Sequence, residues 1–580
     1  MPRNTRRHSR YIPLEDPPES LDNLQPAQPG IEARYEPFQQ AGAQDFQRAP
    51  DSSYDTANEY GGAGELHDLP ETTQYAQPKV EISDANDKLP LWKAVKKYPR
   101  VVAYCFAVTT SILGWGYASV LISSVNNVDE FLHHFGEEMD GEWQIPGMWQ
   151  SVWMSFDAVG GALGSAAGGW IQDRLGRKRS MIIGGVWSAV GVVIVFASDT
   201  PASVNGRRGM FLVGRMLEGF AVGIMKTTAM AYVSENAPTA LRGSAMALFP
   251  TFTLVGQVLG TAVIMGVRAI NLDNNYRIAF STEWLFSILA VVLGIFLPES
   301  PSHLVRKNQT RKALESARKL YAPHVSPEKE LDRIVASVRK EAEKAYKPGY
   351  LECFRGVNGR RTWIIVFTNV LPALFGLDLL SQASYFLLTI GMPSQMGLLF
   401  QLLGIALAIV ANAASVWLLS RIGRRTATIP SLAAATLLWT AMGVAGFFSG
   451  TGMQYVTAVS MIAVILVCGL GAWPAGFAIM GETSALSLRA KSQAIGGISS
   501  HLTSIVVNFV LPLLYSRDGA NLGSKTGFVY TALCAVAVVT SWLFIPEMKG
   551  RSALEIDHMF AIGLPARSFK AWRGDVALPV

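Results

Sequence analysis

The chain contains 580 residues, of which 50% are apolar and only 16% are charged. A soluble protein of this length divides into several domains and carries about a quarter of its residues as charged side chains. The composition therefore excludes an ordinary soluble protein, and the formal net charge of +6 gives no indication of a nucleic-acid partner.

The first ninety residues differ in composition from the rest of the chain. They are rich in Pro, Gln, Asp, Glu and Gly and poor in branched aliphatic residues, which is typical of a disordered tail. They also contain no apolar run that would form a signal peptide. We therefore expect residues 1–90 to be a disordered cytoplasmic tail and the first apolar span to act as the insertion signal.

Twelve apolar stretches follow the tail, each of about 18–28 residues and long enough to cross a hydrocarbon core about 30 Å thick. They lie near 100–124, 149–171, 181–198, 209–233, 244–268, 279–297, 362–390, 396–419, 427–449, 454–480, 492–515 and 527–545. Three of the four cysteines fall within them, so we expect no disulfide framework. The pattern predicts an all-α integral membrane protein with twelve transmembrane helices.

A charged segment at 301–361 separates the sixth and seventh spans. Its residues Leu331, Ile334, Val335 and Val338 have helical spacing and form one apolar stripe on a charged helix. We expect short amphipathic helices here, lying against the cytoplasmic face of the bundle. The residues after the last span, 547–580, are expected to form a cytoplasmic C-terminal tail.

Basic residues gather in the loops on one side of the predicted membrane. They follow spans two, four, eight, ten and twelve and fill the 302–361 loop, whereas the loop after span one is acidic; Arg207 and Arg208 are exceptions. The positive-inside rule makes the basic side cytoplasmic. We therefore predict a multi-pass plasma-membrane protein with both termini in the cytoplasm.

Several short motifs occur twice at nearly the same separation. The segment 173–178 (DRLGRK) recurs at 420–425 (SRIGRR), 247 positions later, and Glu235 with Arg242 recurs as Glu482 with Arg489. Pro298-Glu299 likewise recurs as Pro546-Glu547. A parallel repeat of six spans predicts two six-helix bundles, at 95–300 and 362–546, with a site between them.

Motifs for covalent chemistry are absent from the sequence. It contains no Gly-rich phosphate loop, no metal-ligand spacing and no nucleophile elbow. We therefore expect no enzyme, cofactor or metal site, and any energy for transport has to come from a solute or ion gradient. The expected partners are a small-molecule solute, possible coupling protons and the lipid bilayer, and we expect a monomer.

Charged residues within the spans are functional candidates, because burying them in a membrane costs several kcal/mol unless they are paired or face water. Arg215, Glu218 and Lys226 share one face of span four, and Asp157 and Asp378 lie in spans two and seven. Three acids against two bases leave one acid that can take up a proton or balance a cationic solute. Static salt bridges explain the same charges, and the lone His501 of span eleven suits a proton carrier or a packing residue.

The repeated motifs resemble the sugar porter family of the major facilitator superfamily. The matching pieces are 173–180, 232–243, 298–301, 421–425, 482–491 and 546–557, and two more, at 353–362 and 522–528, are similar to the fungal α-glucoside (maltose) permease branch. The resemblance covers about residues 95–560. It implies the major facilitator fold and a secondary transporter of a sugar or sugar-like polar solute that works by alternating access.

A cytoplasmic gate is expected at the repeated Arg and Glu residues. A carboxylate at the end of span four or ten can meet guanidinium groups from the loops after spans two and eight, closing the inner side when the site faces outward. The alternative is that these charges only anchor the topology. The candidates for the gate are Arg174, Glu235, Arg242, Arg421, Glu482 and Arg489.

The solute site departs from the family pattern. The resemblance implies an Asp in span one, a Gln in span seven and a Gln before Trp284, where this chain has Ala118, Pro372 and Glu283. Gln257 matches a sugar-binding Gln of the family. We predict solute binding by Gln257, Gln382, Asp378, Trp284 and Asn508, and proton coupling through Asp157 or Asp378, with Glu218 and His501 as the next candidates.

Two other functions fit the same helices. One is the export of a specialised metabolite, which the altered solute site and charges would suit. The other is a nutrient sensor that binds solute without transporting it and signals through the N-terminal tail. The direction of transport, the coupling and the solute stay open at this point.

Overall fold

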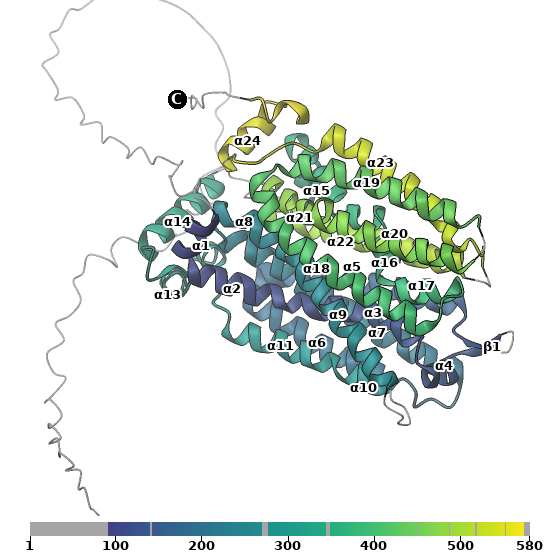
Figure 1. The fold of residues 1–580 in the computed structure, drawn as a ribbon. Helices are drawn as coiled ribbons and strands as arrows, with labels where there is room; N and C mark the ends of the chain where they lie inside the picture. Colours follow the sequence, from purple (N-terminus) through teal and green to yellow (C-terminus); the bar gives the residue numbers. More distant parts are fainter. Residues whose placement is uncertain are drawn as a thin grey trace, which may run out of the picture. The chain divides into compact units, whose positions relative to one another are not determined.

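The computed structural model describes residues 91–139, 142–269, 276–343, 349–448, 450–485, 488–516, 519–551 and 553–572. The tail expected at 1–90 lies outside these residues. The described chain is almost entirely helical (Figure 1). Its one sheet is a hairpin, β1 (Glu137–Met139) with β2 (Glu142–Gln144), which follows the short helix α4 (Asp129–Phe135) in the acidic loop.

Twelve long helical segments correspond to the twelve predicted spans. The first six are α2 (Pro99–Thr109) with η2 (Thr110–Ile112) and α3 (Leu113–Val125), α5 (Gly147–Leu175), α6 (Arg177–Phe196), α7 (Val204–Asn236), α8 (Thr239–Met246) with α9 (Leu248–Arg268), and α10 (Tyr276–Ser281) with α11 (Glu283–Phe296). The last six are α15 (Gly356–Leu374) with α16 (Leu377–Ser381) and α17 (Ala383–Thr389), α18 (Ser394–Arg421), α19 (Arg424–Ala445), α20 (Thr451–Leu470) with α21 (Ala472–Thr483), α22 (Arg489–Tyr515) and α23 (Gly527–Phe544).

Within the described residues, nine of these segments are long and apolar enough by themselves to cross a membrane. The other three are α5, α7 and the series α15 to α17. Helix α5 is rich in glycine and serine, α7 carries Arg215, Glu218 and Lys226, and the third segment is interrupted at Gly376. The three segments that are least apolar are therefore among those that supply the polar side chains described below.

The helices pack into two halves with matching internal contacts. In the first half α7 packs on α5 and α6, and α9 packs on α3; in the second half α20 packs on α18 and α19, and α22 packs on α15. The halves meet where α5 contacts α22 and where α9 contacts α18 (Figure 1). Because α5 and α18 are repeat counterparts, as are α9 and α22, the two contacts are equivalent under the repeat.

Short helices connect the halves. They are α12 (Pro301–Arg306), α13 (Thr310–Tyr321) and α14 (Pro327–Glu343), followed by the turn η3 (Tyr350–Phe354). Leu331 of the predicted apolar stripe is buried against Leu304 and Ala313, which gives α14 the amphipathic packing expected from its sequence. The end of the bundle next to these helices, which also holds α1 (Leu91–Lys97) and α24 (Ala553–Ala561), is called the linker end below.

The four cysteines, Cys105, Cys353, Cys468 and Cys534, are free and buried.

Candidate solute cavity and its supporting charges

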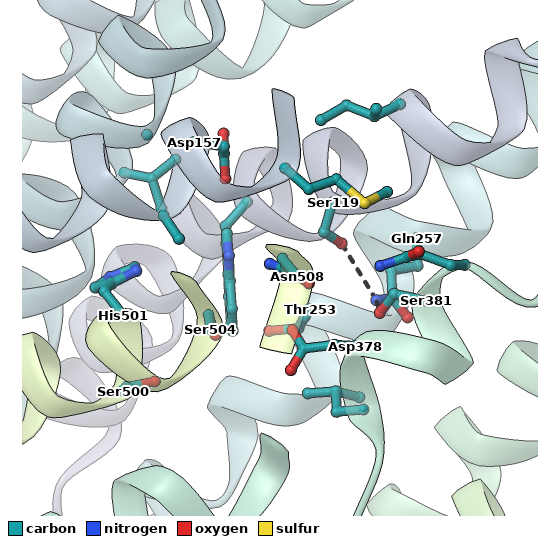
Figure 2. A pocket seen from close by; sticks show the side chains of 18 of the residues that line it. Ser119, Asp157, Thr253, Gln257, Asp378, Ser381, Ser500, His501, Ser504 and Asn508 are labelled. Atoms are coloured by element: carbon teal, nitrogen blue, oxygen red, sulfur yellow. Dashed lines mark hydrogen bonds between the residues drawn. The ribbon is translucent and has the colours of Figure 1, made fainter. Parts of the chain in front are cut away.

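A cavity of about 90 Å³ lies between the two halves, lined by α3, α5, α7 and α9 on one side and by α16, its flanking residues and α22 on the other (Figure 2). Twelve of its nineteen lining residues carry polar or charged side chains. Of the residues predicted from sequence, seven line it: Asp157, Lys226, Gln257, Asp378, Gln382, His501 and Asn508. Residues from spans that are far apart in sequence thus meet in one place.

Uncharged hydrogen-bonding groups occupy one part of the cavity wall. The Gln257 amide donates to the hydroxyl of Ser381 at 2.9 Å and to that of Ser119 at 3.3 Å, which joins α9 to both halves (Figure 2). The Gln382 side-chain oxygen accepts a bond of 2.9 Å from the Tyr515 hydroxyl. Amides and hydroxyls both donate and accept, so this wall suits a solute with several hydroxyl groups.

Charged and titratable groups form another part of the same wall. The Lys226 ammonium of α7 lies 4.1 Å from the centre of the Trp115 ring, and its charge interacts with that of Asp378 on α16. Oδ2 of Asp378 and Nε2 of His501 are buried and have no hydrogen-bond partner among the described residues. The ring of His501 lies close to the backbone of Gly161.

The chain breaks its helix where it supplies Asp378. Gly376 has φ +93°, a conformation that glycine adopts without steric cost, and a Cβ there would lie 2.7 Å from the Trp439 ring. The break ends α15 and starts α16, so that Asp378 and Ser381 face the cavity rather than continuing the spiral of α15. In the sequence, the retained glycine at this position was the one indication of the helix break.

Arg215 organises a cluster of three carboxylates beside the cavity. Its guanidinium lies 3.0 Å from Asp157 and 3.6 Å from Glu283, and it also contacts Glu218. It donates weakly, at 3.4 Å, to the backbone carbonyl of Ala118, the position where the family pattern has an Asp. Asp157 is the member of this cluster that lines the cavity (Figure 2).

Trp284, predicted to bind solute, lies elsewhere. It lines an apolar groove between α6 and α11, with its ring centre 5.6 Å from that of Phe196. Consecutive helical residues point about 100° apart, so when Glu283 turns inward to Arg215 its neighbour Trp284 turns away. Glu283 faces inward instead, and in the sequence it stood out only as a departure from the family pattern.

The predicted pairing of Arg and Glu occurs twice at the linker end, but in each half a different arginine from the predicted one makes it. Nη2 of Arg177 lies 2.6 Å from Oε1 of Glu235, and Nη2 of Arg424 lies 2.6 Å from Oε1 of Glu482. The arginines named from sequence, Arg174 and Arg421, instead stack on Trp170 and Trp417, each four residues earlier on its own helix. Arg174 and Arg421 therefore do not make the predicted contact.

Two further carboxylates, Glu299 and Glu547, support these pairs. Glu299 accepts from the backbone amides of Arg177 and Lys178 at 2.7 and 3.2 Å, and Glu547 accepts from those of Arg424 and Arg425 at 2.9 and 3.1 Å. Each thus caps the N-terminus of α6 or α19, where the free amides and the helix dipole favour a negative charge. The repeat at Pro298-Glu299 was visible in the sequence, but this role was not inferred from it.

Contacts at the linker end also join the two halves. Nη1 of Arg489 donates to the backbone carbonyl of Ser234 at 3.0 Å, and Nε of Arg489 donates to Ser484 at 3.2 Å. Its repeat counterpart Arg242 donates to the carbonyl of Ala237 at 3.3 Å, and its charge interacts with that of Glu482 in the other half. Arg242 and Arg489 thus each interact with the opposite half at this end.

His303 borders the network outside the membrane-spanning helices. Its Nδ1 accepts from Nη1 of Arg177 at 2.8 Å, which requires that nitrogen to be unprotonated. Burial and the positive charge of Arg177 lower the pKa of His303 to about 4. The imidazole is therefore neutral at physiological pH and accepts a hydrogen bond from the arginine that holds Glu235.

Two related bundles around a polar cavity, with matching ion pairs at one end, define a transporter of the major facilitator type. Residues 102–560 match the family described as "Sugar (and other) transporter". This match covers well over half of the chain, so the protein belongs to that family.

Individual relatives agree with this class. The chain is 29% identical over 528 residues to the MFS transporter fmqE of Aspergillus fumigatus, covering 86% of this chain and 94% of the relative. It is 27% identical to the alpha-glucosides permease MPH3 of Saccharomyces cerevisiae, covering 85% and 83%, and 24% identical to the maltose permease MAL61 of that organism, covering 90% and 87%.

Solved structures confirm the fold. The proton:xylose symporter XylE bound to 6-bromo-6-deoxy-D-glucose superposes with a TM-score of 0.69 at 19% identity, covering 80% of this chain and 99% of the symporter. The inward open conformation of XylE from E. coli superposes with a TM-score of 0.62. The protein is thus an all-α membrane protein with the predicted twelve transmembrane helices in two six-helix bundles.

Proposed function

We propose that the protein carries a sugar or sugar-like polar solute across the plasma membrane by alternating access. The observation that supports this most directly is the polar cavity between the halves, where the Gln257 amide bonds to hydroxyls of both halves. The names of the relatives, which include alpha-glucoside and maltose permeases and a xylose symporter, indicate the same solute class. They favour neither the exporter nor the sensor alternative.

The gating part of the proposal rests on the linker end. Arg489–Ser234 and the charge interaction of Arg242 with Glu482 connect the two halves at this end. The pairs Arg177–Glu235 and Arg424–Glu482 each lie within one half and order the helix ends that make those contacts. Opening the cavity toward this end requires the contacts between halves to break. Because bidentate and charge-assisted hydrogen bonds are strong when formed and are lost together, they suit a gate with two states.

Proton coupling is the second part of the proposal, and it runs through Asp157. Keeping all three carboxylates ionised around a single desolvated guanidinium costs free energy, because two of the negative charges are left uncompensated. The cluster therefore holds a proton in at least one conformational state. Asp157 is the member that reaches the cavity, and it replaces the acid that the family pattern places at Ala118. A static salt bridge would keep the same geometry without exchanging protons.

The proposed orientation puts the linker end and both termini in the cytoplasm, with the protein acting as a monomer. The clustered basic residues near the linker end support this orientation through the positive-inside rule. Transport is then import when an inward proton gradient drives it.

The test is uptake by the purified full-length protein in proteoliposomes. Radiolabelled maltose, glucose and xylose are offered with an inward proton gradient, with the gradient collapsed, and in counterflow against the same unlabelled sugar. We expect counterflow of at least one sugar and gradient-dependent accumulation. Absence of counterflow for sugars and polyols alike would overturn the sugar assignment, whereas counterflow without gradient-driven accumulation would overturn only the coupling.

A further inference from the structure

Two opposite charges on the cavity wall come from different halves of the protein. Lys226 belongs to α7 in the first half and Asp378 to α16 in the second, and both line the cavity. Their charges interact, yet Oδ2 of Asp378 is buried without a hydrogen-bond partner among the described residues. A buried, unpartnered carboxylate oxygen costs free energy unless a ligand or water satisfies it.

The Lys226 ammonium packs on an aromatic ring of the cavity wall. Its ammonium lies 4.1 Å from the centre of the Trp115 ring, a cation–π contact that holds the charge in place. The ring accepts no conventional hydrogen bonds, and an ammonium has three donors. Donors of Lys226 therefore remain for a group in the cavity, while Nε2 of His501 on the same wall is also buried without a described partner.

We propose that Lys226 and Asp378 form a two-point clamp for adjacent hydroxyl groups of a neutral, polyhydroxylated solute. A hydroxyl can accept from the ammonium and donate to the carboxylate, so a vicinal diol satisfies both groups. This inference rests on the proposed sugar transport and narrows it: one part of the solute binds to the Gln257 and Gln382 wall and a diol binds to the clamp.

The balance of charge selects a neutral solute. The charges of Lys226 and Asp378 compensate each other, so a neutral ligand gains hydrogen bonds from both without leaving an uncompensated charge in the membrane interior. A carboxylate or phosphate on the solute would be repelled by Asp378, and an amine would be repelled by Lys226. Because the clamp residues belong to different halves, a solute held by both also connects those halves.

The clamp is tested by equilibrium binding and counterflow with the purified full-length protein. The variants are Lys226→Met, Asp378→Asn and the double variant, which removes both charges and so leaves no unpaired charge to prevent folding. The matched control is Lys525→Met, since Lys525 lies 4.8 Å from the centre of the Phe447 ring but does not line the cavity. The probe is whichever of maltose, glucose and xylose the parent protein binds, together with its monodeoxy analogues.

We expect each single variant to weaken sugar binding by about tenfold to a hundredfold, as for the loss of a hydrogen bond to a charged group. Lys525→Met should bind like the parent. Deleting one or two adjacent hydroxyls from the sugar should weaken binding to the parent by a similar factor but should have no further effect in the clamp variants.

The outcomes separate the clamp from the wider proposal. If the parent binds and exchanges sugars, and Lys226→Met and Asp378→Asn bind them equally well, the clamp is wrong and sugar transport stands. The clamp is also wrong if every deoxy analogue loses the same factor in parent and variants, or if the parent prefers a sugar acid or an amino sugar. If the parent binds no neutral polyol, both proposals fail.

Discussion

The guanidinium of Arg215 lies 3.0 Å from the carboxylate of Asp157, while the position that carries an acid in the family pattern is Ala118, whose backbone carbonyl receives only a weak bond from the same guanidinium. Span one thus lacks the acid of the family pattern, and the acid next to the guanidinium is Asp157 of span two. Because Asp157 also lines the cavity, we expect a solute and a proton to reach the same ion pair.

The first prediction is that Asp157→Asn abolishes accumulation driven by a proton gradient while counterflow exchange continues. The asparagine cannot release a proton, and Arg215 keeps Glu218 and Glu283 as partners, so the variant should fold. The measurement is sugar uptake in proteoliposomes with and without an imposed gradient. Asp199→Asn is the matched control, because Asp199 pairs with Arg277 away from the cavity.

Asp378→Asn belongs in the same experiment, since Asp378 is the other carboxylate on the cavity wall. Gradient-driven accumulation that survives in Asp157→Asn would rule out Asp157 as the carrier, and survival in Asp378→Asn as well would rule out both acids. The proton would then have to be sought at Glu218 or His501, and a parent protein that ignores the gradient would be a uniporter.

The second prediction concerns the linker end. Arg177→Gln or Glu235→Gln should lower the transport rate by about tenfold or more, because a charge-assisted hydrogen bond worth about 1.5–3 kcal/mol is lost from one conformational state. Arg424→Gln and Glu482→Gln should behave alike. Membrane insertion should not change, and initial uptake rates at matched protein levels give the comparison.

Arg174→Gln and Arg421→Gln are the controls for this prediction. Their guanidinium groups stack on Trp170 and Trp417 rather than meeting the glutamates, so both variants should transport at close to the parental rate. Equal losses at Arg174 and Arg177 would falsify the assignment of the pairs to a gate and would favour a shared role as topology anchors.

Much of the fold could be predicted from the sequence because the membrane makes segment length and hydropathy informative. The repeat also placed a basic motif and a glutamate at the same separation in each half, although the pairs form at Arg177 and Arg424 and not at the predicted Arg174 and Arg421. What the pattern could not supply was the direction of each side chain. Arg174 and Arg177 stand in one basic motif, and only the turn at Gly176, where α5 ends and α6 begins, decides which of them faces Glu235.

The cavity was predictable in part for the same reason. Charged residues at membrane depth pointed to Asp157, Lys226 and Asp378 because such charges are costly unless they are used. By contrast, Glu283 and Trp284 are adjacent in sequence but face different surroundings, Arg215 and the groove between α6 and α11, and the family pattern drew attention to Trp284. No sequence pattern indicated the contact between Lys226 and Trp115, which lie 111 positions apart.

The third prediction is the orientation. A cysteine introduced at Lys312, on the exposed surface of α13, should be protected from an impermeant thiol reagent in intact cells, whereas a cysteine at Glu138 in the hairpin should react. Both positions should react after the cells are permeabilised. The four native cysteines are buried and give a low background. Labelling at 312 from outside would reverse the proposed topology.

The last prediction concerns pH and His303. Its folded-state pKa of about 4 lies below the ordinary value near 6.5, so between these pH values the unfolded chain binds a proton that the folded chain does not. The contribution of this group to the free energy of unfolding is therefore fully present above about pH 6.5. It decreases as the pH drops toward 4 and does not change further below 4. Protonation would place a second positive charge next to Arg177 and remove the acceptor that the guanidinium now uses.

His303→Gln keeps a hydrogen-bond acceptor but does not titrate. The melting temperature of the purified variant in detergent should therefore fall less steeply than that of the parent as the pH drops from 6.5 to 4. His558→Gln, at a histidine of α24 whose ring lies beside Trp572, is the control and should keep the parental slope. Identical slopes for the parent and His303→Gln would show that the imidazole is not held neutral by this arginine.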